Sequence, residues 1–110
     1  MKNKVCYVRS ILSKEITILC NDSKKTKFLR SIQGKRRFLV SSEWVIRYSS
    51  NEDLAKIFEK LRNEGFLFSY DQHGWGPSDL FKHYREQGLL TGKFKEIFWI
   101  GDGKYRVTDE

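Results

Sequence analysis

The stretch SNEDLAKIFEKLRNEG, residues 50–65, carries the clearest helix pattern in the chain. It opens with a capping serine and two acidic residues, which favour the N-terminus of a helix. Apolar side chains then recur at helical spacing, at Leu54, Ile57, Phe58 and Leu61. Gly65 ends the pattern. The stretch therefore predicts one amphipathic helix, whose apolar face must pack against other elements.

The sequence before this helix has the β-branched and aromatic composition of antiparallel strands. Five strands are expected there: residues 5–12, 15–21, 26–32, 36–42 and 44–48. Ser13-Lys14 joins the first two strands, and Gln33-Gly34-Lys35 joins the third and the fourth. The pattern therefore predicts two antiparallel hairpins and one further strand that extends their sheet.

The sequence after the helix predicts a short extended run, a second helix and a third hairpin. The run covers residues 66–70. Pro77, followed by an acid in the first turn, begins the second helix, and Gly88 ends it. Asp102-Gly103 is typical of a two-residue hairpin turn. A regular register around this turn pairs Ile100 with Tyr105, Trp99 with Arg106 and Phe98 with Val107, so that Phe98, Ile100, Tyr105 and Val107 form one apolar face.

Length and composition indicate one compact domain. The chain has 110 residues, of which 39% are hydrophobic and 32% charged, and this balance suits a folded core. No apolar run approaches the ~20 residues that cross a bilayer, and residues 1–10 lack the apolar core of a secretory signal. We therefore expect a single α+β domain over residues 1–110, with N-terminal antiparallel β hairpins, two helices and a C-terminal β hairpin. A cytoplasmic protein without membrane contact is the simplest expectation.

Cys6 and Cys20 are the two cysteines of the chain. Each lies in a strand-like run, and their spacing does not match a zinc or redox motif. We expect two reduced core thiols, with a disulfide between the paired strands as the alternative. No metal and no cofactor is predicted.

Positive charge is concentrated in the first third of the chain. Residues 1–37 hold 11 Lys and Arg against two acidic residues, a net charge of +9, whereas residues 38–110 carry a net charge of −2. The segment 24–37 is basic throughout and contains no acidic residue. Its cations are Lys24, Lys25, Lys27, Arg30, Lys35, Arg36 and Arg37. A surface of this kind favours contact with nucleic-acid phosphates, DNA or RNA.

Other interpretations of this segment remain open. Lysines on an exposed edge strand also discourage edge-to-edge aggregation. An acidic protein partner, such as the surface of a larger nucleic-acid enzyme, would attract the same charges, which makes an inhibitor or adaptor the alternative function. An exposed apolar patch formed by Trp44, Trp75 or Trp99 would favour a protein interface. Cations that line a concave surface would favour nucleic acid.

The last third of the chain resembles the end of a winged helix-turn-helix domain. The residues that carry the resemblance are REQGLL at 85–90 and GDGKYRVTDE at 101–110. The resemblance implies that residues 77–88 are a recognition helix presenting Lys82, His83 and Arg85, and that Lys104 and Arg106 lie on the wing. The alternative is an ordinary helix and an ordinary hairpin in another α+β fold.

Two further features have a functional and a structural interpretation. Trp75, between two glycines on a predicted loop, suits stacking on a base or anchoring an interface, and it suits equally a side chain folded over the core. His73, His83, Arg85 and Glu86 are residue types that a small ribonuclease uses. No nucleophile or phosphate-loop motif accompanies them, so no catalytic residue is assigned and enzyme activity is the less favoured function.

Overall fold

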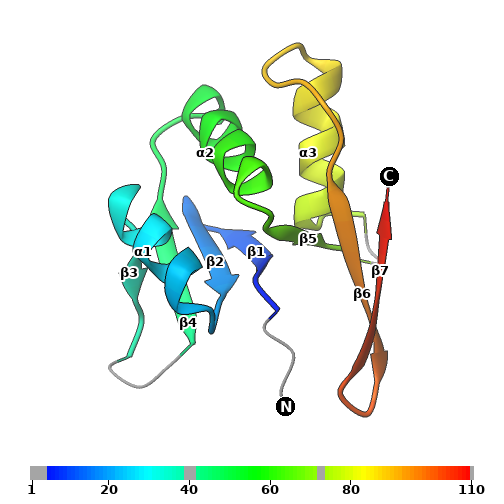
Figure 1. Cartoon of the computed structure of the whole chain (residues 1–110). Helices are drawn as coiled ribbons and strands as arrows, with labels where there is room; N and C mark the ends of the chain where they lie inside the picture. The colour runs from blue at the N-terminus through cyan, green and yellow to red at the C-terminus, as the bar shows by residue number, and fades with distance from the viewer. Residues whose placement is uncertain (1–4, 39–41, 72–73, 110) are drawn as a thin grey trace.

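The structure, a computed structural model, describes residues 5–38, 42–71 and 74–109 (Figure 1). Within these ranges it has three helices and one seven-stranded sheet. The helices are α1 (Ser23–Ser31), α2 (Asn51–Asn63) and α3 (Pro77–Glu86). The strands are β1 (Tyr7–Leu12), β2 (Glu15–Leu19), β3 (Lys35–Arg36), β4 (Glu43–Arg47), β5 (Leu67–Ser69), β6 (Lys95–Gly101) and β7 (Lys104–Asp109). The expected α+β class is confirmed. No helix among the described residues is long and apolar enough to cross a membrane.

The strand order in the sheet is β3-β4-β2-β1-β5-β6-β7. The pairs β1–β5 and β5–β6 are parallel, and the other neighbours are antiparallel. Parallel neighbours need a crossover connection. The connection from β1 to β5 ends with α2, and the connection from β5 to β6 contains α3. The short strand β5 therefore lies inside the sheet and joins its N-terminal and C-terminal halves (Figure 1).

The first hairpin forms as predicted. β1 and β2 pair antiparallel, with Leu12 opposite Glu15 across the Ser13-Lys14 connection. Ser13 and Lys14 have φ angles of 54° and 63°. Positive φ at both central residues is the conformation of a type I′ turn, whose twist matches that of the flanking strands.

The predicted second hairpin is wrong, because residues 26–32 belong to helix α1 and its end. Asp22 caps this helix by accepting a hydrogen bond of 2.9 Å from the backbone N–H of Lys24. Phe28 and Ile32 lie one helical turn apart and pack against the core, and Leu29 is fully buried. The alternation of apolar and basic residues suggested a strand, but the same positions also satisfy helical spacing.

The rest of the predicted hairpin is shorter than expected. Of residues 36–42, the structure places Arg36 in β3, and residues 39–41 lie outside the described residues. Gly34 makes the tight passage from α1 into β3: its N–H donates to the Leu29 carbonyl at 2.7 Å. A Cβ at Gly34 would stand 2.7 Å from the same carbonyl oxygen, so a side chain does not fit there.

The C-terminal hairpin has the predicted turn and a different register. Asp102 and Gly103 both have positive φ, and Gly101 pairs with Lys104. An irregularity between Trp99 and Gly101 then inserts Ile100 as an extra residue. The observed pairs are Trp99 with Tyr105, Phe98 with Arg106 and Ile97 with Val107. The predicted apolar face is therefore wrong, because a one-residue shift exchanges the faces of a strand.

The hydrophobic core lies between the three helices and one face of the sheet. All three helices contribute to it, together with alternate residues of the central strands such as Val8, Ile18 and Phe68. The Phe68 ring lies 5.1 Å from those of Phe58 and Phe81 and 5.6 Å from that of Phe94, between ring centroids. The helices predicted at residues 50–65 and 77–88 are confirmed as α2 and α3, and they supply Phe58 and Phe81.

Candidate functional site

Three basic side chains of the segment 24–37 form a stripe on the outer face of α1. Lys24, Lys27 and Arg30 are three residues apart in sequence, so they follow one another along the helix surface. All three are exposed. We call this stripe the basic ridge.

The basic ridge leads into a concave surface at the β3 edge of the sheet, which we call the basic groove. The groove has a volume of about 770 Å³. Its lining residues are Glu15, Arg30, Gln33, Gly34, Lys35, Arg36, Arg37, Val45 and Arg47. Five of these side chains are cationic and one is acidic. The structure thus brings four of the seven predicted cations together, although on a helix and an edge strand instead of a hairpin.

Trp44 forms a buried platform beneath two of the groove cations. It is 2% exposed and lies in the core on β4. The guanidinium carbons of Arg30 and Arg36 lie 5.3 Å and 5.1 Å from its ring centroid. Arg36 also stands opposite Trp44 in the β3–β4 pairing. Cation–π attraction therefore holds these two guanidinium groups at the wall of the groove.

The other two arginines of the groove form ion pairs. Arg37 forms ion pairs with Glu43 and, at 3.9 Å, with Glu15. Arg47 pairs with Glu15 at 3.2 Å. These partly exposed contacts contribute little to stability. Arg47 was not predicted as a site residue. Its place in the groove depends on the β2–β4 pairing, for which the local sequence carries no signal.

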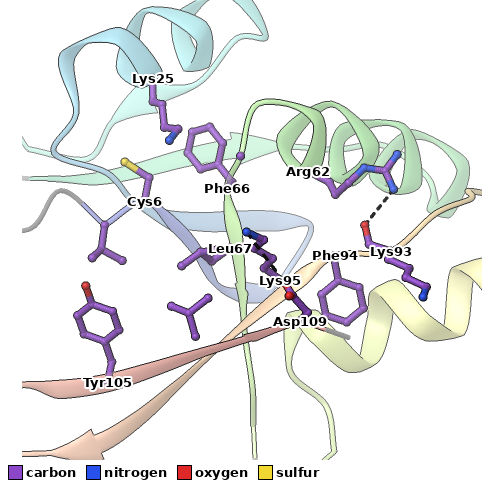
Figure 2. Close-up of a pocket in the computed structure, with 13 residues that line it drawn as sticks. Cys6, Lys25, Arg62, Phe66, Leu67, Lys93, Phe94, Lys95, Tyr105 and Asp109 are labelled. Atoms are coloured by element: carbon purple, nitrogen blue, oxygen red, sulfur yellow. Dashed lines mark hydrogen bonds and ion pairs between the residues drawn. The ribbon is translucent and has the colours of Figure 1, made fainter.

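Lys25 lies apart from the groove, in a second concave region that we call the Cys6 cleft. The cleft has a volume of about 730 Å³ (Figure 2). Its lining residues are Val5, Cys6, Lys25, Arg62, Gly65, Phe66, Leu67, Lys93, Phe94, Lys95, Tyr105, Val107 and Asp109. Arg62 donates hydrogen bonds to the carbonyls of Thr91 and Lys93, at 2.8 Å and 3.3 Å, so its guanidinium is engaged in holding the loop before β6.

The four cations implied by the winged helix-turn-helix resemblance do not form one cluster. Lys82 lies over the ring of Phe94, the residue just before β6. Arg85 donates to the Gly92 carbonyl at 2.8 Å. Lys104 lies at the opposite end of β6, beside the hairpin turn, and Arg106 stacks over Phe98. A strand of this length spans about 20 Å, at ~3.3 Å per residue. The resemblance itself stays a prediction.

The tryptophans are divided between the core and the surface. Trp44 is buried, whereas Trp75 is 80% exposed on the loop before α3 and so does not fold over the core. Trp99 is half exposed beside Tyr7 and Tyr105, at centroid distances of 5.5 Å and 5.3 Å. Ile100 and Val107, on the same C-terminal hairpin, are also exposed. The C-terminal hairpin therefore carries several exposed apolar side chains, which do not line the groove and do not include Trp44.

The residues considered for ribonuclease activity do not line the groove. His83 and Glu86 are exposed on α3, and Arg85 is bound to the Gly92 carbonyl. His73 lies outside the described residues. The described lining of the groove contains no histidine.

Comparison with known proteins adds no relative to this picture: no protein-family model, no curated protein and no solved structure matches the chain.

Proposed function

We propose that this protein binds nucleic acid, and that the basic ridge and the basic groove contact the phosphate backbone. The observation that supports the proposal is the groove: five cationic side chains line one concave surface with a single carboxylate. Phosphate contacts of this kind supply affinity and positioning without reading the base sequence.

The contacts of the cations are consistent with such a role. Among the described residues, Lys24, Lys27 and Lys35 form no ion pair with a carboxylate. Their ammonium groups keep water and mobile counterions as neighbours, and phosphates replace these with a gain in entropy. Arg30 and Arg36 are held in place by Trp44, so less side-chain freedom is lost on binding.

Two observations favour the other interpretations of the same charges. β3 is an edge strand, so Lys35 and Arg36 also protect the sheet against edge pairing. The exposed Trp99, Ile100 and Val107 suit a protein interface, which keeps an inhibitor or adaptor for an acidic protein as the alternative function. Edge protection by itself does not account for the cations of the basic ridge on α1.

The decisive experiment is fluorescence anisotropy with labelled duplex DNA, single-stranded DNA and RNA at several salt concentrations. The double variant Lys35→Ala/Arg36→Ala removes two groove cations. If both contact phosphates, the slope of log K against log salt becomes shallower by about 1.8 on a duplex or about 1.4 on a single strand. Affinity at low salt falls in parallel.

Lys56→Ala/Lys60→Ala is the matched control, because it removes the same charge from the exposed face of α2. Its salt slope is expected to stay at the wild-type value. Equal slopes for the groove variant and the wild type would remove the groove as the contact surface. If the wild type binds none of the three nucleic acids at low salt, the proposal fails, and an acidic protein becomes the partner to isolate.

A further inference from the structure

Cys6 and Cys20 stand side by side at one end of the β1–β2 pair. Tyr7 and Leu19 are directly opposite each other in this antiparallel pairing. Cys6 comes immediately before Tyr7 and Cys20 immediately after Leu19, so the two cysteines are opposite each other as well. Their sulfur atoms are 2.7 Å apart and both thiols are free and buried. Opposite residues of antiparallel strands have Cα atoms about 4.5–5.5 Å apart, a separation that a disulfide bridges without backbone movement.

One of the two cysteines lies at a route to solvent. Cys6 lines the Cys6 cleft, and Figure 2 shows its sulfur near the end of the Lys25 side chain. Cys20 lies behind it, with its Sγ 3.8 Å from the Asp22 carbonyl. A small oxidant that enters the cleft therefore meets Cys6 first. This arrangement, an accessible thiol with a second thiol in contact behind it, is that of redox-active cysteine pairs.

We propose that Cys6 and Cys20 form a reversible intramolecular disulfide, with hydrogen peroxide as the oxidant. The Cys6 thiolate attacks one peroxide oxygen, the O–O bond breaks, and hydroxide leaves, which gives Cys6 sulfenic acid. The Cys20 sulfur then attacks the Cys6 sulfur, the S–O bond breaks, and water leaves with the Cys20 proton. Two thiols lose two hydrogen atoms, and one peroxide becomes two molecules of water.

The electrostatics of the pair assign the two roles. The hydrogen bond from Cys20 lowers the pKa of Cys6 to about 7, against the opposing effect of burial. Backbone N–H groups of Asp22 and Asn21 and the Lys25 ammonium act in the same direction. The same hydrogen bond, together with burial, raises the pKa of Cys20. Cys6 therefore loses its proton before Cys20 does, and the thiolate that is present near neutral pH is on Cys6.

The disulfide is tested by intact mass spectrometry of the whole native chain after brief treatment with hydrogen peroxide. The expected product is a monomer lighter by about 2 Da, with both cysteines protected from alkylation after denaturation, and dithiothreitol restores both thiols. In Cys20→Ser, Cys6 lacks its resolving partner, so its sulfenic acid is trapped by dimedone. Cys6→Ser forms neither product.

Two results would overturn this inference. One is a wild-type protein that keeps both thiols alkylatable under conditions that oxidise free cysteine. The other is a disulfide that forms only between chains. Both are read on the wild-type protein, so they do not depend on the folding of the variants. Nucleic-acid binding plays no part in this experiment, which therefore stands or falls independently of the proposed function.

The pH dependence of the oxidation rate separates a paired thiol from an ordinary one. Because the thiolate is the nucleophile, the rate is expected to rise with pH and to level off above a midpoint of about 7, the pKa of Cys6. The titratable and charged groups near Cys6 are Cys20, the Asp22 cap and Lys25 of α1, and the lining of the cleft adds Arg62, Lys93, Tyr105 and the Lys95–Asp109 ion pair. Cys20→Ala removes the principal cause of the lowered pKa of Cys6. In this variant the rate at which peroxide consumes the Cys6 thiol should therefore have its midpoint at a higher pH. An unchanged midpoint would contradict the assigned roles.

Discussion

Phe68→Ala is expected to lower the free energy of unfolding by about 3–5 kcal/mol, because it leaves a cavity at the centre of the aromatic core. Phe68 is fully buried on β5 and touches the rings of Phe58, Phe81 and Phe94. A domain of this size is stable by about 5–15 kcal/mol, so the variant loses a large part of its stability. Urea denaturation followed by circular dichroism measures the change.

Trp75→Ala is the control for this measurement. It removes a larger aromatic side chain, but one that is 80% exposed on a loop. Its expected effect lies within about 0.5 kcal/mol of zero. A loss below about 1 kcal/mol in Phe68→Ala would mean that β5 does not hold the two halves of the core together.

Replacement of Trp44 is expected to affect stability and nucleic-acid affinity together. Trp44→Ala should cost about 3–5 kcal/mol, because the indole is buried. The variants Trp44→Phe and Trp44→Leu separate the two effects, since both keep an apolar side chain and only Phe keeps an aromatic face for Arg30 and Arg36.

The Leu variant should therefore bind nucleic acid less tightly than the Phe variant, by up to about thirtyfold, given about 0.5–1 kcal/mol for each of the two cation–π contacts. Anisotropy titrations at one salt concentration compare the two variants, and thermal unfolding confirms that both are folded. If the Leu and Phe variants bind equally, the platform does not orient the groove cations. A Leu variant that also binds as tightly as the wild type would show that the Trp44 ring has no role in binding.

The parts of the fold that could be predicted are those with strong local signals. The cap and apolar spacing of α2, the proline at the start of α3, and the turns at Ser13-Lys14 and Asp102-Gly103 all lie where the sequence places them. α1 was missed because Phe28 and Ile32 satisfy a period of two as well as helical spacing. The extra residue Ile100 carries no turn or glycine signal of its own, so the register of the last hairpin was one residue out.

The sequence predicts which basic residues form the candidate site, but it does not predict the elements that carry them. The basic residues 24–37 were identified from charge alone, but the two sides of the groove come from a helix and an edge strand. Lys25 turns to the Cys6 cleft because helical spacing directs it away from Lys24 and Lys27. Arg47 and the Trp44 platform depend on strand pairings between distant parts of the chain, and short-range patterns do not contain that information.

The position of β5 in the middle of the sheet has a consequence for synthesis on the ribosome. β1, β2 and β4 emerge first and can pair with one another, but the other side of β1 waits for Leu67 and Phe68 of β5. At about 5–20 residues per second, that wait lasts on the order of 3–10 s. During this time an interior strand of the finished protein is a bare edge, open to pairing with another nascent chain. The arrival of β5 closes it, so the interval before residue 68 is translated is when this chain is most exposed to misassembly.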